Sequence, residues 1–194
     1  MRTTFLLVRH GQSEWNREGR WQGLADPPLT ELGVRQAQEL AEHLASERID
    51  AIYASDLRRA LATAEIIAAP RGLTVVVEPA LREIDVGEWS GLTTDEIETH
   101  YPDGFRRHLE GGDGWEQGEP HAEMSARIVS AIERIARLHP GECVLCVLHG
   151  GVIRALLAHA EGVDLQAFRR TNRGPANGTV ARIAVEDLTF SRID

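Results

Sequence analysis

Two apolar segments near opposite ends of the chain both end in a histidine followed by a glycine. Residues 5–8 lead into Arg9-His10-Gly11, and Cys143–Leu148 leads into His149-Gly150-Gly151. Short apolar runs that stop at polar residues are typical of buried strands. Because parallel strands deliver their carboxyl ends to one edge of a sheet, where open α/β folds bind ligands, we expect the two histidines at one shared edge.

Strands alternate with amphipathic helices along most of the chain, which predicts an α/β protein. The fold class we expect is a three-layer α/β/α arrangement, a mostly parallel sheet with helices on both faces. Alternating polarity over residues 179–185 and 188–193 predicts a hairpin that gives this sheet an antiparallel edge. The other expected strands are Thr3–Arg9, Ala51–Ala54, residues 74–77 and Cys143–Leu148, with helices after Thr30, after a Ser55-Asp56 cap, before Pro140 and from Val152.

The length of 194 residues favours one hydrophobic core, so we expect a single domain over residues 1–194. Residues 101–120 contain glycines and prolines at a density typical of a loop. A loop of that length is too long for a simple connection. We interpret residues 101–120 as a lid-like insertion.

The formal net charge of −9 argues against a nucleic-acid partner, because such binding needs many lysines and arginines. The chain contains no apolar stretch near the roughly 20 residues that span a bilayer, and its first residues lead directly into a strand. We therefore expect a cytoplasmic protein without a membrane partner.

Cys143 and Cys146 form a C-x-x-C pattern, for which zinc binding and thiol redox chemistry are the alternatives to simple burial. Residues three apart on a strand point to opposite faces, and the chain has no second cysteine pair to complete a zinc site. Structural cysteines are the better interpretation.

Arginine and histidine side by side at a strand end suggest chemistry on a phosphoryl group. The guanidinium of Arg9 matches phosphate geometry, and the imidazole of His10 can attack phosphorus. Neighbouring guanidinium groups lower the pKa of an imidazole, which keeps it neutral and nucleophilic. Gly150 and Gly151 would allow close approach of the backbone to the anion, at the start of a helix whose positive end faces it.

Four ordered motifs resemble the histidine phosphatase superfamily, also called the phosphoglycerate mutase-like family. The resemblance extends from the first strand to the second histidine motif, and its specificity comes from the order of the motifs. They are Arg9-His10-Gly11-Gln12-Ser13-Glu14-Trp15-Asn16 with Gln22-Gly23, Ser55-Asp56-Leu57-Arg58-Arg59-Ala60, Leu81-Arg82-Glu83 with Gly87-Glu88-Trp89, and His149-Gly150-Gly151.

The resemblance implies that His10 is the nucleophile, that Glu83 is the proton donor, and that Arg9, Arg59 and His149 surround the phosphoryl group. Asp85 and Glu88 are rival candidates for the proton donor. We expect no metal and no cofactor, because no ordered set of Asp, Glu, His or Cys ligands accompanies the motifs and the arginines already supply positive charge. The family's dimers make a homodimer a candidate assembly. The residues that it places at the phosphate or the rest of the substrate are Gly11, Ser13, Asn16, Gln22, Gly23, Gly150 and Gly151.

Three functions are compatible with these motifs. The favoured one is a metal-independent phosphatase that hydrolyses small phosphomonoesters through a phosphohistidine. A cofactor-dependent phosphoglycerate mutase is the main alternative, and a non-catalytic phosphate-binding regulatory module is the third. Mutases hold the substrate carboxylate with basic residues from the segment between the acid and the second histidine, where this chain offers Arg106, Arg107 and His108.

The physiological substrate is left open between sugar phosphates, phosphoglycerate derivatives and ribazole phosphate. Among the tryptophans, Trp115 is the best candidate for substrate contact, whereas the others serve equally well as pocket wall or as packing. The histidines outside the motifs are expected to be solvated or at helix ends, and they are His43, His100, His108, His121, His139 and His159.

Overall fold

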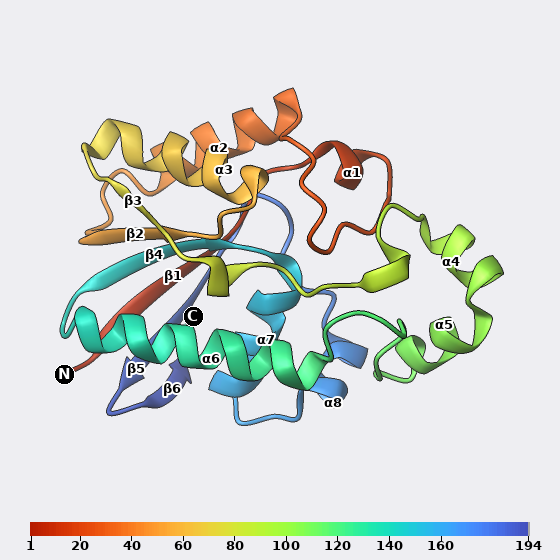
Figure 1. Ribbon diagram of the computed structural model, residues 1–194. Helices are drawn as coiled ribbons and strands as arrows, with labels where there is room; N and C mark the ends of the chain where they lie inside the picture. Colours follow the sequence, from red (N-terminus) through yellow and green to blue (C-terminus); the bar gives the residue numbers. More distant parts are fainter. Residues whose placement is uncertain (194) are drawn as a thin grey trace.

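The computed structural model describes residues 1–193, which form a six-stranded mixed sheet with helices on both faces (Figure 1). The strand order is β3-β2-β4-β1-β5-β6, and the four strands from β3 to β1 run parallel. The predicted α/β fold class is confirmed. The strands are β1 (Thr3–Arg9), β2 (Ala51–Ala54), β3 (Val75–Val77), β4 (Cys143–Leu148), β5 (Val180–Glu186) and β6 (Thr189–Arg192).

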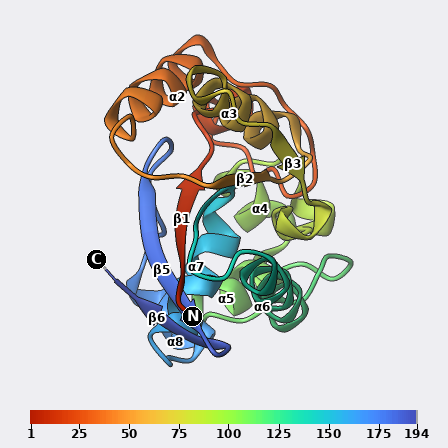
Figure 2. The same cartoon turned by 90° about the vertical axis from the view of Figure 1, so that its left-hand side faces the viewer.

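Two hydrophobic clusters lie on opposite faces of the sheet, because successive side chains of a strand point to opposite sides. Phe5 and Leu7 of β1 contribute to one cluster, and Leu6 and Val8 contribute to the other. Figure 2 shows the helices α2 (Glu31–His43) and α3 (Arg58–Ala68) on one side of the sheet and α6 (His121–Leu138) and α7 (Gly150–Ala160) on the other.

The chain ends in the predicted antiparallel hairpin. Strand β5 pairs antiparallel with β1 and with β6. Asp187 and Leu188 form the turn with φ angles of 49° and 63°, which are the positive values that a two-residue hairpin of this twist requires. The edge of the sheet is therefore antiparallel, as the alternating pattern predicts.

Residues 101–120 differ from the expected continuous loop. Helix α5 covers Pro102–Leu109, directly after α4 (Thr94–His100), so the prediction of a loop is wrong for these eight residues. Proline fits the first turn of a helix because its missing N–H has no intrahelical partner there. Asp103 in the first turn and Arg106 in the last turn match the helix dipole.

The start of α3 also differs from the prediction. The helix begins at Arg58 without a side-chain cap from its N-cap residue Leu57. Ser55 Oγ accepts from the N–H of Leu57, and Asp26 Oδ1 accepts from the N–H of Arg58 at 2.7 Å. A loop residue distant in the sequence thus provides the cap expected from Ser55-Asp56.

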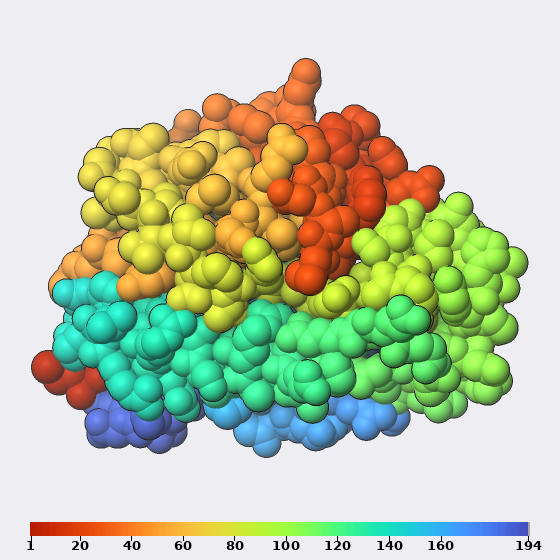
Figure 3. Space-filling model, in the orientation of Figure 1, coloured from red at the N-terminus to blue at the C-terminus, as the bar shows by residue number. Residues whose placement is uncertain are grey.

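Helices α4 and α5 form one end of the molecule, beside the loop that follows α1 (Glu14–Arg17) (Figure 3). Helix α8 (Leu165–Thr171) follows α7. Cys146 is buried in one core cluster and Cys143 packs partly buried against the other, and both are free thiols, as expected for structural cysteines. No helix within residues 1–193 is long and apolar enough to cross a membrane.

Candidate active site

The pairing of β1 with β4 brings the two motif histidines together. Arg9 lies opposite Leu148 in the parallel register, and the N–H of His10 donates to the Leu148 carbonyl at 3.1 Å. The His10 and His149 rings are 5.1 Å apart between centroids in an edge-on arrangement. Both side chains are buried, so the two imidazoles form the floor of a site at the carboxyl edge of the sheet.

The surroundings of His10 favour a neutral imidazole with a defined tautomer. Its Nδ1 lies 2.7 Å from the carbonyl oxygen of Gly11, which can only accept, so Nδ1 carries the proton. Nε2 is then left with its lone pair. Burial is the largest cause that holds the pKa of His10 well below its usual range, followed by the charge of Arg59.

His149 is held by a contact with the strand next to its own. Its Nε2 lies 3.0 Å from Ser55 Oγ, while its Nδ1 is buried without a partner among the described residues. Burial, and then Arg59, hold the pKa of His149 well below its usual range, so this ring is also neutral near pH 7.

Arg9 and Arg59 bring positive charge to the two histidines. Arg9 Nη1 donates to the Pro175 carbonyl at 2.7 Å, and Arg59 donates to the Ala25 and Gly23 carbonyls at 2.6 and 2.9 Å. Burial lowers the pKa of Arg9, and it lowers that of Arg59 to about 10, so both stay charged at neutral pH. Because their protein partners are neutral carbonyls, their charge remains available to an anion.

Glu83 faces this cationic group from the segment after β3. Its Oε2 accepts from the N–H of Gly151 at 3.0 Å, and its Oε1 accepts from the N–H of Ile84 at 3.0 Å. Both amides therefore hold the carboxylate near the start of α7.

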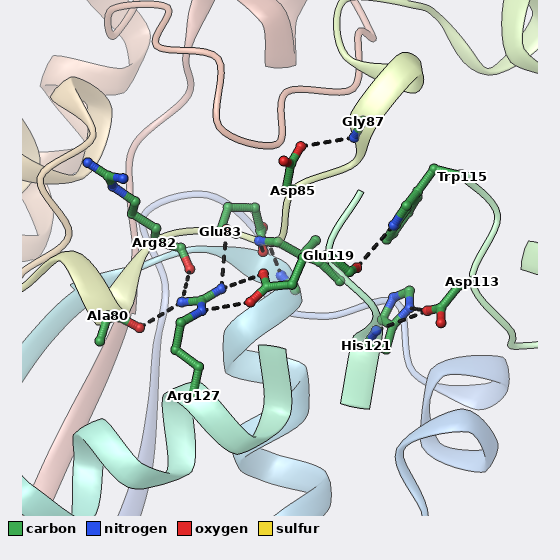
Figure 4. A network of polar contacts seen from close by, with 12 residues as sticks. Ala80, Arg82, Glu83, Asp85, Gly87, Asp113, Trp115, Glu119, His121 and Arg127 are labelled. Carbon is green, nitrogen blue, oxygen red and sulfur yellow. Dashed lines mark hydrogen bonds and ion pairs between the residues drawn. The ribbon is translucent and has the colours of Figure 1, made fainter. Parts of the chain in front are cut away.

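An ion pair fixes the backbone that carries Glu83 (Figure 4). Arg127 of α6 donates from Nε and Nη2 to the two carboxylate oxygens of Glu119, at 2.8 and 2.7 Å. Its Nη1 also donates to the carbonyls of Ala80 and Arg82 at 2.7 and 3.0 Å. Arg127 therefore connects Glu119, at the end of the expected lid, to the backbone segment that carries Glu83.

The rival carboxylates are engaged elsewhere. Asp85 accepts from the N–H of Gly87, and Glu88 accepts from the N–H groups of Glu116 and Gln117. Neither of them lines the cavity described next, so Glu83 is the carboxylate at the site.

A cavity of about 290 Å³ opens over His10. Trp15, Trp21 and Trp115 contribute to its wall, whereas Trp89 is fully buried in the core. Trp115 is itself almost fully buried, and its Nε1 donates to the Glu119 carbonyl. Of the residues expected to act on or bind the substrate, those that line the cavity are Arg9, His10, Asn16, Gln22, Gly23, Arg59, Glu83 and Gly151.

Ser13, one of the expected substrate-binding residues, lies behind the cavity lining. Its Oγ caps α1 by accepting from the N–H of Asn16, and it lies 2.9 Å from Gln22 Oε1. Ser13 thus positions two residues that do line the cavity.

Gly11, His149 and Gly150 are also outside the lining, and His149 is fully buried. A Cβ on Gly11 would lie 2.2 Å from the Gly33 carbonyl oxygen, so Gly11 permits a close backbone contact. A Cβ on Gly150 would lie 3.4 Å from the Arg9 guanidinium, an ordinary contact. The structure gives these glycines a packing role beside the charged groups.

Five basic residues that line the cavity were not predicted as site residues, and one of them, Arg20, pairs with Glu18 and Glu96. Arg154, Arg169, His108 and His121 come from α7, α8, α5 and α6. His108 and His121 lie at helix ends, one of the two expected settings, in the last turn of α5 and at the first residue of α6. Neither ring is solvated, because both are partly buried in the cavity wall. Only Arg154 shows a sequence pattern that could have indicated its place in the site. It lies four residues after Gly150, and residues at that spacing share one face of a helix.

The lid arginines do not contribute to the cavity lining. Arg106 pairs with Asp103, and Arg107 pairs with Glu116, and both side chains are exposed. Within the described residues 1–193, no three histidine, cysteine or acidic side chains gather in a way that could hold a metal ion.

Comparisons with known proteins agree with the motifs. The sequence model of the histidine phosphatase superfamily (branch 1) matches residues 5–193. Phosphoserine phosphatase 1 of Hydrogenobacter thermophilus is 41% identical over 165 residues, which is 84% of this chain and 78% of that protein. The probable phosphoglycerate mutase GpmB of Cronobacter sakazakii is 41% identical over 167 residues, which is 84% of this chain and 77% of that protein.

Solved structures share the whole fold. YhfR of Bacillus stearothermophilus superimposes with a TM-score of 0.91 at 36% identity, over 98% of this chain and 95% of that one. A phosphoserine phosphatase mutant of Entamoeba histolytica in complex with phosphoserine gives a TM-score of 0.87 at 26% identity, over 99% and 95%. The family predicted from the four motifs is therefore confirmed, and this chain belongs to branch 1 of the histidine phosphatase superfamily.

Proposed function

We propose that this chain hydrolyses small phosphomonoesters by transferring the phosphoryl group to His10 and then to water. The observation that carries the proposal is the state of His10. Its Nδ1 is held by the Gly11 carbonyl, and burial keeps the ring neutral, so Nε2 has a lone pair to offer in a cavity lined by guanidinium groups. A neutral imidazole beside bound phosphate is the arrangement that nucleophilic catalysis needs.

Arg9, Arg59 and His149 bind the phosphoryl oxygens in this proposal. Among residues 1–193 no carboxylate is bonded to either guanidinium group, and each group has a buried Nε without a partner there. If Ser55 Oγ–H donates to Nε2 of His149, the unpartnered Nδ1 carries a proton that it can donate to the phosphate. Such donors stabilise the charge on the equatorial oxygens as the transferring group loosens.

Asn16, Gln22 and Gly23 complete the phosphate site in the proposal. Asn16 is fixed by its mutual hydrogen bonds with Ser13 at the start of α1. Gln22 and Gly23 lie on the same cavity wall, and Gly23 also anchors Arg59 through its carbonyl. These contacts support polar binding of the ester oxygens next to the guanidinium groups.

Glu83 moves the proton in both steps. In the first step Nε2 of His10 forms a bond to phosphorus, the ester P–O bond breaks, and Glu83 gives its proton to the leaving oxygen. In the second step water attacks phosphorus, Glu83 takes the proton of that water, and the P–N bond breaks to restore neutral His10. A phosphate dianion near Glu83 favours the protonated carboxyl that the first step requires.

Residues 101–120 serve as the lid of the site in this proposal. His108 of α5 and Trp115 in the following loop line the cavity wall. Movement of the segment would admit the ester and exclude bulk water during transfer.

Hydrolysis is favoured over mutase activity by the lid arginines. Arg106 and Arg107 point to Asp103 and Glu116 instead of the cavity, so they do not grip a substrate that must be retained for rephosphorylation. The similarity to GpmB makes the mutase reaction the alternative to test.

The test compares phosphate release from several monoesters with the interconversion of 3- and 2-phosphoglycerate in the presence of the bisphosphoglycerate primer. We expect phosphate release to be faster. Primer-dependent isomerisation that outpaces release would assign the chain to the mutases. Phosphate binding without turnover of any ester would assign it to the non-catalytic modules.

A further inference from the structure

The cavity over His10 is also lined by basic residues that the sequence motifs did not predict. We call Arg154, Arg169, His108 and His121 the basic wall. They come from four helices, α7, α8, α5 and α6, so the wall exists only in the folded chain. The two phosphoryl-transfer steps proposed above use none of their side chains.

Arg154 carries a charge without a bonded partner. Among residues 1–193 its guanidinium forms no hydrogen bond or ion pair, and its Nε is buried. Its stem packs over Gly174, where a Cβ would lie 3.1 Å from Arg154 Cδ. Burial lowers the pKa of Arg154, and the negative charge of Glu83 opposes this effect. A buried charge without a partner is costly, so an arginine held in this way indicates an anionic ligand.

Arg169 is oriented by neutral groups. Its Nη1 donates to the Gly111 carbonyl at 2.7 Å, and its Nη2 lies 3.2 Å from Nδ1 of His108. Its Nε is buried without a partner among the described residues. Burial, and then Arg154, lower the pKa of Arg169 to about 10, so the residue is charged at neutral pH.

The two histidines of the wall are neutral at pH 7. Burial, and then Arg169, lower the pKa of each to about 4. Nδ1 of His108 accepts from Arg169, so Nε2 of His108 carries the proton and is a donor. His121 donates from Nδ1 to Asp113, and this contact engages the carboxylate whose negative charge acts on Arg169.

We propose that Arg154 and Arg169 bind a carboxylate on the substrate, so that the preferred esters are those of small hydroxy acids and hydroxy amino acids. The proposal rests on the proposed function and names the substrate class of that site. A guanidinium pair with a neighbouring N–H donor matches the two oxygens of a carboxylate. The cavity of about 290 Å³ spans both anion positions, which suits a small substrate with charges at its two ends.

The first test uses substrate pairs that differ in the carboxylate. One pair is 3-phosphoglycerate and glycerol 3-phosphate, and the other is phosphoserine and phosphoethanolamine. Charge-assisted hydrogen bonds predict a kcat/KM at least about tenfold higher for the carboxylate member of each pair. Equal kcat/KM values within each pair would overturn the proposal. Faster hydrolysis of propane-1,3-diol bisphosphate than of the carboxylate substrates would also overturn it, because the basic wall would then bind a second phosphate.

The second test removes the arginines one at a time. Arg154→Met and Arg169→Met should each lower kcat/KM for the carboxylate member by about tenfold or more, mainly through KM. Activity on glycerol 3-phosphate should fall less than about threefold, and this retained activity also reports a folded site. Arg106→Gln is the matched control, because it removes the same charge from the exposed face of α5. Equal losses on both members of a pair would overturn the assignment.

Binding measurements separate failure of this proposal from failure of the proposed function. Titration calorimetry of 3-phosphoglycerate and glycerol 3-phosphate into the His10→Ala protein needs no turnover. We expect 3-phosphoglycerate to bind more tightly than glycerol 3-phosphate, and we expect this difference to disappear in the His10→Ala, Arg154→Met double variant. That result would support the carboxylate subsite even if the wild-type protein hydrolyses no ester. Equal binding overturns the subsite, while hydrolysis of both esters would leave the proposed function intact.

Discussion

The main-chain N–H of Gly151 donates to the carboxylate of Glu83 at 3.0 Å, which joins the first turn of α7 to the segment that follows β3. The contact requires glycine, since a Cβ at position 151 would lie 2.4 Å from Oε1 of Glu83. His149, Gly151 and Arg154 lie within one and a half turns of chain. The start of α7 therefore sets the positions of the second histidine, the acid and Arg154 together.

Gly151→Ala should displace Glu83 and lower kcat/KM by about 100-fold, the size of effect expected for a misplacement near 1 Å. Alanine favours a helix, so the thermal midpoint should stay within a few degrees of the parent. Steady-state kinetics and thermal unfolding check the two statements. Gly150→Ala should lose less activity, because its Cβ would meet Arg9 only at 3.4 Å, and equal losses in both variants would contradict the account.

Glu83→Gln removes the proton that the leaving group needs, so its effect should depend on that group. We expect a loss of about 100-fold or more for alkyl phosphates and a much smaller loss for an aryl phosphate such as p-nitrophenyl phosphate. Glu88→Gln is the comparison, because Glu88 bonds to the N–H groups of Glu116 and Gln117 outside the cavity. A selective loss in Glu88→Gln instead would move the acid role to that residue.

Stability should fall as the pH drops below about 6.5, the usual pKa of an unfolded histidine. Burial holds the pKa of His108 and His121 near 4 and that of His10 and His149 well below the usual range. The unfolded chain therefore gains protons that the folded chain does not, and each group lowers the free energy of unfolding by up to about 1.4 kcal/mol per pH unit.

Urea unfolding between pH 7.5 and pH 5 measures this slope. Removing one buried ring, in His108→Gln, should flatten it, whereas the exposed His43→Gln serves as the control. A free energy of unfolding that is constant over this range would show that the four rings are not held neutral by the fold.

Chelation should leave activity unchanged, because Arg9 and Arg59 supply the positive charge at the phosphoryl group in the proposed mechanism. The rate with p-nitrophenyl phosphate should be the same before and after dialysis against EDTA. A large loss that one divalent ion restores would require a metal in the mechanism.

The strands and the proximity of His10 to His149 could be predicted because short apolar runs in the sequence indicate both. The apolar runs that end at Arg9 and Leu148 predict parallel strands, and the parallel register then places the following residues side by side. Glu83 was predicted from its motif alone. Its hydrogen bond to Gly151 joins residues that are far apart in the sequence, so no local pattern contains it.

The basic wall could not be predicted for the same reason. Arg154 shares a helix face with Gly150, but that spacing alone does not show whether its side chain faces solvent or a cavity. Arg169 meets His108 only because α8 packs near α5, which is a tertiary contact. The helix at Pro102–Leu109 was missed because its proline and the glycines around it suggested a loop, although a proline in the first turn is compatible with a helix.

The central claim is that phosphate passes through Nε2 of His10, and trapping the intermediate tests it most directly. Wild-type protein is mixed with ³²P-labelled phosphoserine, quenched in base within milliseconds and digested for peptide mapping. The account predicts label on the peptide that contains His10, stable in base and labile in acid, and no label in His10→Ala that remains folded by circular dichroism. Normal labelling of His10→Ala, or turnover without any labelled histidine in the wild type, would contradict the account.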